Sequence, residues 1–401
     1  MDRIIFHIDV NNAFLSWTAI ELLKDGYKKD IRNIVSVIGG DEKSRTGIVL
    51  SKSTLAKKFG IKTGETLYSA RSKYKKLEVF PPDYNYYVKM STSLFKLLSK
   101  YSPDIEVASI DECYLDYGKV KNLYGDEIEF AYKLKDEIKN KLGFTVNIGI
   151  ANNKLCAKMA SDFEKPDKVH TLYKSEIKTK MWPLPIEDLF GIGRSGSEKL
   201  KNIGVKTIED LANLNIDSIY KIFKNQSQHA IDIANGIDNS ELVMYTEAKG
   251  IGNEITLPKD ERNIERLNEK LLMLSEMVGK RLRKEGKFTN TICITLKDNN
   301  FIRKSHQKTL KNPTDSTNEI YRVAKEALKE FYKGEGIRLI GIRLDNLTTK
   351  ESHQISLFED YESSNKDSKL DKVVDEINSK LGKDVIRKAS LKDKYIRNKK
   401  Y

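Results

Sequence analysis

The sequence predicts an α+β protein built from several domains. Its 401 residues are enough for two to four domains. Strand-like and helix-like segments mix irregularly over the first 165 residues, which predicts a sheet made from non-consecutive pieces. Residues 166–235 contain only helical patterns and glycine turns, whereas residues 249–347 return to strands that alternate with two helices.

Short β-branched runs and apolar residues at i, i+3 and i+4 define the elements of the first part. The predicted strands lie at 3–10, 33–40, 46–51 and 144–151, with two more in 106–118 that meet at a tight turn. The predicted helices lie at 13–24, which follows an Asn start signal, and at 53–60, 86–100, 127–142 and 152–163.

The second half contains fewer predicted elements. Residues 236–248 are typical of a linker, and strands are predicted at 250–257, 291–298 and 338–345. From residue 348 the chain is polar, with a single apolar island at Gln354–Phe358 and one helix predicted at about 370–381.

The charge and the cysteines narrow the functional class. A net charge of +13 favours a polyanionic partner, either nucleic acid or an anionic membrane surface; a solvated lysine surface is the alternative. Asp2 and Asp9 bracket the first apolar run, unlike a secretory signal, and no stretch is long enough to span a membrane. The three cysteines include no C-x-x-C pair, so neither a zinc site nor a disulfide framework is expected, and we predict a cytoplasmic protein.

Three carboxylates are predicted at adjacent strand ends. Asp9 ends the first strand, and Asp111 and Glu112 lie at the later strand turn. Such a group repels itself unless cations neutralise it, and hard oxygen ligands suit Mg²⁺. Asp-Glu pairs recur along this chain, but only the pair at 111–112 has apolar strand residues on both sides, where acids are costly unless paired or bound to metal.

These residues resemble two motifs of the Y-family DNA polymerases. Ile8-Asp9-Val10 followed by Asn-Asn-Ala-Phe is similar to the first catalytic motif, and Ser109-Ile-Asp-Glu112 is similar to the second; the resemblance covers residues 1–347. It implies a polymerase IV-like, template-directed enzyme that is error-prone, tolerates damaged bases and lacks proofreading. It also implies two Mg²⁺ ions, or Mn²⁺ instead, held by Asp9, Asp111, Glu112 and the Val10 carbonyl.

The resemblance further implies a right-hand architecture. Its expected parts are a palm (1–10 and 78–165), small fingers (11–77), a helical thumb with a helix-hairpin-helix (166–235), a linker (236–248), a mixed α/β little finger (249–347) and a tail (348–401).

The expected nucleotide site follows from the same resemblance. It comprises Asn12, Ala13, Phe14, Thr54, Lys57 and Lys165. Phe14 is expected to be the steric gate that excludes a 2′-hydroxyl, and the alternative is a core side chain on an apolar helix face. Thr54 and Lys57 stand where the family carries Tyr and Arg, so weaker triphosphate binding is a hypothesis. Asn11 replaces a second family Asp and is not expected to bind metal.

Two regions are expected to hold primer-template DNA. Leu189–Gly193 resembles a helix-hairpin-helix, in which glycines bring backbone N–H groups to a phosphate; a simple helix cap is the alternative. The expected contacts are Gly191, Gly193, Lys199 and Lys201 there, and Arg303, Lys304, Arg338 and Arg343 on the little-finger strands. A solvated sheet face is the alternative for the strands.

The apolar island in the tail resembles a sliding-clamp peptide, with Gln354, Leu357 and Phe358 as its anchors. Packing against the little finger is the alternative. The protein is expected to act as a monomer on DNA and deoxynucleoside triphosphates.

Three rival functions remain compatible with parts of the sequence. Gly39-Gly-Asp-Glu42 resembles the signature of diguanylate cyclases, but Lys43 follows it and it precedes the Ser-Ile-Asp-Glu segment, so a surface turn is favoured. The second rival is a clamp-bound DNA-binding scaffold without activity, and the third is a polymerase V-like subunit that needs partner proteins.

Overall fold

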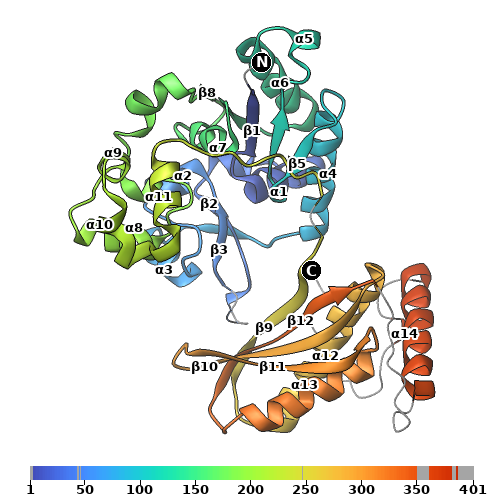
Figure 1. The fold of residues 1–401 in the computed structure, drawn as a ribbon. Helices are drawn as coiled ribbons and strands as arrows, with labels where there is room; N and C mark the ends of the chain where they lie inside the picture. Colours follow the sequence, from blue (N-terminus) through green and yellow to red (C-terminus); the bar gives the residue numbers. More distant parts are fainter. Residues whose placement is uncertain are drawn as a thin grey trace. The chain divides into compact units, whose positions relative to one another are not determined.

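The computed structural model describes residues 3–42, 45, 47–245, 247–349, 361–381, 385 and 386. The chain forms two compact units, one of residues 1–40 and 47–246 and one of residues 41–46 and 247–401 (Figure 1). Among the described residues, no helix is both long and apolar enough to cross a membrane. The three cysteines are buried free thiols.

A five-stranded sheet in the order β5-β6-β1-β7-β8 forms the centre of the first unit (Figure 1). Its strands are β1 (Ile5–Val10), β5 (Ile105–Val107), β6 (Glu112–Asp116), β7 (Val146–Ala151) and β8 (Val169–Thr171). The predicted strand turn is present, because β5 and β6 pair antiparallel. The expectation that 166–235 is purely helical is wrong, since β8 pairs parallel with β7. Three residues are too few to show a strand period.

Every residue of β1 is buried, and alternate side chains enter two different cores. Phe6, Ile8 and Val10 join the core under α1 (Ala13–Lys24), α4 (Tyr84–Leu98) and α6 (Glu127–Leu142). Ile5 joins the core on the other face, which is covered by α7 (Lys154–Asp162). His7 and Asp9 therefore project on the α7 side of the sheet.

Residues 36–80 form a small sheet in the order β3-β2-β4. Its strands are β2 (Ser36–Gly39), β3 (Val49–Lys52) and β4 (Glu78–Phe80), and its helices are α2 (Thr54–Lys58) and α3 (Leu67–Lys73). The sequence predicted α2, β2 and β3 but missed β4 and α3, which are short and carry a weak apolar period.

Residues 174–234 are helical apart from their turns. The α-helices are α8 (Arg194–Asn202), α9 (Ile208–Ala212), α10 (Ile216–Phe223) and α11 (Ser227–Ala234).

The first unit also contains short helical turns. They are η1 (Ile31–Asn33), α5 (Lys121–Tyr124), η3 (Lys174–Glu176), η4 (Ile177–Met181), η5 (Ile186–Asp188) and η6 (Lys224–Gln226).

The second unit is a four-stranded sheet in the order β11-β10-β12-β9, with helices on one face. Its strands are β9 (Gly250–Glu261), β10 (Phe288–Asp298), β11 (Arg303–Thr314) and β12 (Ile337–Thr348). Its helices are α12 (Ile264–Lys284), α13 (Thr317–Phe331) and α14 (Tyr361–Leu381). The helix predicted at 370–381 thus begins earlier, at Tyr361. Gln354–Phe358 lies outside the described residues.

Candidate active site

One cleft of the first unit, of about 340 Å³, gathers the predicted metal and nucleotide residues except Glu112. The β1–α1 turn, the end of β3, the start of α2 and the segment after α7 form its walls. The predicted residues that line it are Asp9, Val10, Asn12, Ala13, Phe14, Thr54, Lys57, Asp111 and Lys165.

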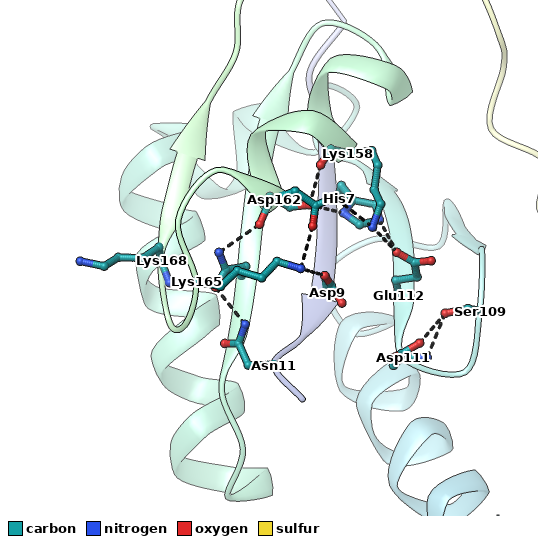
Figure 2. A network of polar contacts seen from close by, with 12 residues as sticks. His7, Asp9, Asn11, Ser109, Asp111, Glu112, Lys158, Asp162, Lys165 and Lys168 are labelled. Carbon is teal, nitrogen blue, oxygen red and sulfur yellow. Dashed lines mark hydrogen bonds and ion pairs between the residues drawn. The ribbon is translucent and has the colours of Figure 1, made fainter. Parts of the chain in front are cut away.

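Backbone pairing brings the three carboxylates to one edge of the sheet. Asp9 of β1 lies opposite Glu112 of β6 in the antiparallel register. The Val10 N–H donates to the Asp111 carbonyl at 3.0 Å, which fixes the turn before β6. The Ser109 hydroxyl donates to Asp111 Oδ1 at 2.6 Å and accepts from the Asp111 N–H at 3.2 Å (Figure 2). The three acids therefore lie at adjacent strand ends.

Asp111 is the least compensated of these acids. Burial raises the pKa of its carboxyl group, the charges of Asp9 and Glu112 raise it further, and the hydrogen bond from Ser109 opposes them. The raised pKa means that the ionised carboxylate of Asp111 is disfavoured. A cation bound beside Asp111 would stabilise this carboxylate.

Glu112 is neutralised from two sides. His7 Nε2 lies 3.2 Å and Lys158 Nζ 2.6 Å from Glu112 Oε2 (Figure 2). The hydrogen bond from His7, opposed by burial and aided by Lys158, lowers the pKa of Glu112 to about 2. Burial lowers the pKa of His7, whose Nδ1 lies 2.8 Å from Ser161 Oγ. His7 and Lys158 together fix the position of the Glu112 carboxylate.

Lys165 performs the same neutralising role for Asp9. Its ammonium group forms ion pairs with Asp9 and, at 2.7 Å, with Asp162 (Figure 2). Burial lowers the pKa of Lys165, but the charges of Asp9 and Asp162 outweigh this and the net shift is upward. Lys158 and Lys165 therefore act as internal counter-ions of the acidic cluster.

The oxygen ligands offered by Asp9, Asp111 and Glu112 suit hard divalent cations, although their side chains do not point at one common position. In the part of the chain that the structure describes, no three His, Cys, Asp or Glu side chains converge on a common metal position. The reason is visible in Figure 2, where Asp9 and Glu112 are directed at the two lysines. Carboxylates on rigid strand ends with exchangeable ammonium partners fit Mg²⁺ or Mn²⁺.

Asn11 has a structural role, because both polar groups of its side chain form hydrogen bonds within the protein. Its side-chain amide donates to Asn147 Oδ1 at 3.0 Å, and its carbonyl oxygen accepts from the Asp167 N–H at 2.9 Å. The Asn147 amide donates to the carbonyl oxygens of Ser161 and Glu164 at 3.0 and 2.7 Å. These bonds hold the segment that presents Lys165, and they leave Asn11 engaged away from the acids.

Phe14 is both part of the core and part of the cleft wall. Its ring stacks on Tyr87 with centroids 4.6 Å apart and an interplanar angle of 9°, and it meets Tyr84 edge-on at 6.0 Å. It is half-buried and lines the cleft. The two interpretations made from the sequence are therefore compatible.

The opposite wall carries positive charge. Thr54 and Lys57 are exposed on α2, whose first turn is capped by a 3.0 Å hydrogen bond from the Ala56 N–H to Ser53 Oγ. Lys52 also lines this wall, and the sequence interpretation missed it together with His7 and Lys158. Strand alternation places Lys52 on the less buried face of β3, but it does not say what that face meets.

The residues expected to contact DNA lie on both units. In the first unit, Gly191 has φ +99° and Gly193 is the N-cap of α8. Lys199 is exposed, and Lys201 pairs with Glu187 at 2.7 Å.

In the second unit, the three arginines among the expected DNA contacts already have partners. Arg303 pairs with Glu254, and Arg343 pairs with Asp345 at 2.8 Å. The Arg338 guanidinium lies 4.7 Å above the Phe301 ring. Lys304 is exposed and, being next to Arg303 on β11, points to the opposite face.

Known proteins are similar to this chain over most of its length. Residues 8–162 match the impB/mucB/samB family, residues 248–357 match its C-terminal domain, and residues 174–205 match its HHH motif. The chain is 47% identical over 396 residues to a DNA polymerase IV of Clostridium acetobutylicum, covering 98% of this chain and 99% of that protein.

Solved structures give the same result. A chimeric Y-family DNA polymerase superimposes with a TM-score of 0.76 at 26% identity, covering 86% of this chain and all of that one. An insertion ternary complex of the Dbh DNA polymerase superimposes with a TM-score of 0.58 at 26% identity, with the same coverage.

Proposed function

Because this chain belongs to the impB/mucB/samB family of Y-family DNA polymerases, we propose that it extends a primer along a template by a two-metal mechanism without proofreading. The observation that carries the proposal is that Asp9, Asp111 and Glu112 lie at the same end of two adjacent strands. The absence of proofreading and the translesion activity of this chain are inferred from the family resemblance.

Two divalent ions, when bound, would activate the primer 3′-hydroxyl and neutralise the leaving pyrophosphate. Asp9, Asp111, Glu112 and the Val10 carbonyl would supply the protein ligands, with Mg²⁺ as the expected ion and Mn²⁺ as the alternative. Lys165 would then leave Asp9 and pair with the triphosphate, which is the stronger anion. Lys158 and His7 would keep Glu112 oriented throughout.

Asn12, Ala13 and Phe14 would form the floor under the sugar. They follow Asp9 directly and line the same cleft. The Phe14 ring is fixed by its stack on Tyr87, so it cannot swing aside for a 2′-hydroxyl without losing that contact. We therefore assign Phe14 as the steric gate that excludes ribonucleotides.

The right-hand division expected from the sequence is retained as part of the proposal. Primer-template DNA would be held without base readout, by Gly191, Gly193, Lys199 and Lys201 of the thumb and by the little-finger strands. Gly193 supports this assignment, because it places the N-terminus of α8 next to the hairpin. The chain would act as a monomer in the cytoplasm on deoxynucleoside triphosphates.

We also propose that Gln354, Leu357 and Phe358 dock on a sliding clamp. The support is the sequence itself: two large apolar side chains in a polar segment are costly unless they bind a partner. Clamp binding would raise the local concentration of primer ends for this polymerase.

The decisive experiment is primer extension on a recessed template with Mg²⁺, comparing the wild type with Asp111→Ala/Glu112→Ala. Templated extension by the wild type that is lost in a folded double variant would support the polymerase and its metal site together. Persistence of a mismatched primer end without nucleotide would support the absence of proofreading. A folded wild type inactive without partners would favour the polymerase V-like subunit, and one inactive even with clamp would favour the scaffold.

A further inference from the structure

Two lysines of β3 and α2 line the same cleft as the acids Asp9 and Asp111. Lys52 is the last residue of β3, and Lys57 lies on α2. Both line the cleft, and neither forms an ion pair with any residue that the structure describes. Lys165 and Lys158, which lie beside the acids, each have a carboxylate partner. Two cations without such partners leave positive charge that an external anion can neutralise.

Lys52 is held in position more firmly than a surface lysine. It is half-buried, and its ammonium group donates to Thr63 Oγ1 at 3.1 Å. Thr63 also lines the cleft. One donated bond leaves two N–H groups of the ammonium available to a ligand.

The electrostatic surroundings of Lys52 favour an incoming negative charge. Burial lowers the pKa of Lys52, the charge of Lys57 lowers it further, and only Glu65 opposes them. Glu65 is already engaged, because it pairs with Lys73 at 2.6 Å and accepts from Ser69 at 2.8 Å. An anion between the two lysines would therefore restore favourable charge pairing.

We propose that Lys52 binds the triphosphate of the incoming nucleotide. It would add a second positive charge beside Lys57, whereas Thr54 offers only a hydroxyl group. This inference rests on the proposed polymerase function. The cleft supports it: the sugar floor at Phe14 and the acids at Asp9 and Asp111 leave the β3–α2 wall for the phosphates. Two ammonium groups and the Thr54 hydroxyl match a polyphosphate in charge and in hydrogen-bond donors.

The test compares Lys52→Met and Lys52→Arg with Lys58→Met. Lys58 is exposed on α2 and does not line the cleft, so its variant makes the same change of net charge outside the site. Equilibrium binding to the enzyme on a dideoxy-terminated primer would be measured for a matched deoxynucleoside triphosphate and for inorganic tripolyphosphate. KM and kcat for single-nucleotide insertion would be measured alongside.

For Lys52→Met we expect both dissociation constants and KM to rise about tenfold with a smaller change in kcat. Lys52→Arg should recover most of the binding, and Lys58→Met should bind like the wild type. Lys52→Met binding as tightly as Lys58→Met, or a fall in kcat alone, would overturn the inference. Tripolyphosphate binding reports on Lys52 even if the wild type extends no primer, in which case it is the proposed function that fails.

Discussion

Asn11 and Asn147 share a buried hydrogen bond of 3.0 Å although 136 positions separate them. Their remaining amide atoms bind the backbone of the segment that carries Lys165. The two asparagines therefore link the first catalytic strand to a lysine proposed to bind the triphosphate. They form a structural connection between the metal side and the nucleotide side of the cleft.

Replacing Asn11 with Ala should loosen that segment. Asn147 Oδ1 would lose one of its two donors and the Asp167 N–H its side-chain acceptor, and we expect the free energy of unfolding to fall by about 1–3 kcal/mol. KM for deoxynucleotides should rise, which steady-state insertion kinetics would measure. If Asn11 acts through Lys165, then Asn11→Ala and Lys165→Ala should combine less than additively in KM. Additive effects would show that Asn11 has only a general structural role.

The strand-end acids could be predicted from the sequence for a clear physical reason. A run of buried apolar residues marks a strand, and an acid at its end has to be compensated, so Asp9 and the Asp111-Glu112 pair stood out. The partners that compensate them could not be predicted. Lys158 reaches Glu112 through the packing of α7 on the sheet, which no local pattern encodes.

The bounds of β11 could not be predicted for a similar reason, although Arg303 and Lys304 were expected on a strand. Arg303–Thr314 is an edge strand whose exposed face and polar composition leave no apolar alternation to detect. Its pairing with β10 is specified by the partner strand, which is a tertiary contact. Lys52 is a similar case in the candidate active site. Its strand was predicted from the sequence, but only the packing of the small sheet of residues 36–80 shows that Lys52 lines the cleft.

Replacing Phe14 with Ala should relax sugar selection. The smaller side chain leaves room for a 2′-hydroxyl, and we expect ribonucleotide insertion relative to deoxynucleotide insertion to rise at least about tenfold. Tyr87→Phe is the matched control, because it keeps the ring under Phe14 and removes only the hydroxyl that lies 2.8 Å from Thr18. Unchanged selectivity in a folded Phe14→Ala enzyme would leave Phe14 as a core residue alone.

Replacing Lys158 with Met should make the free energy of unfolding depend more strongly on Mg²⁺. Without its cation Glu112 is a half-buried, less compensated charge, and we expect unfolding to become easier by about 2 kcal/mol in EDTA. Mg²⁺ should recover much of this loss, which urea unfolding in both conditions would show. The control is Lys154→Met, because Lys154 is also on α7 and pairs with Glu106 of β5 at 2.7 Å. The stability that this variant loses should not respond to Mg²⁺. An equal response of the two variants would contradict a metal at Glu112.

Asp167 should contribute a pH-dependent share of stability. Burial raises the pKa of Asp167, but hydrogen bonds from Lys135 and Lys139 outweigh it and the net shift is downward. A lowered folded pKa stabilises the protein fully above the unfolded pKa of about 4, and this contribution is lost as the pH falls through the lower folded value. Asp167→Asn should cost about 1 kcal/mol near pH 7 and progressively less below pH ~4 in unfolding titrations. A cost that stays constant with pH would show that the charge is unimportant.

Glu254 should restrain DNA binding by the sheet of the second unit. It pairs with Arg303, whose Nη1 also lies 3.2 Å from Glu254 Oε2, so this guanidinium is already neutralised. Glu254→Gln would release Arg303 for a phosphate, and we expect duplex DNA affinity to rise about two- to fivefold near 0.1 M salt, with a steeper salt dependence. Glu319→Gln makes the same net-charge change on α13, where Glu319 pairs with Arg322, and should alter affinity less. Fluorescence anisotropy at several salt concentrations would distinguish the two, and equal slopes would mean that Arg303 does not contact the duplex backbone.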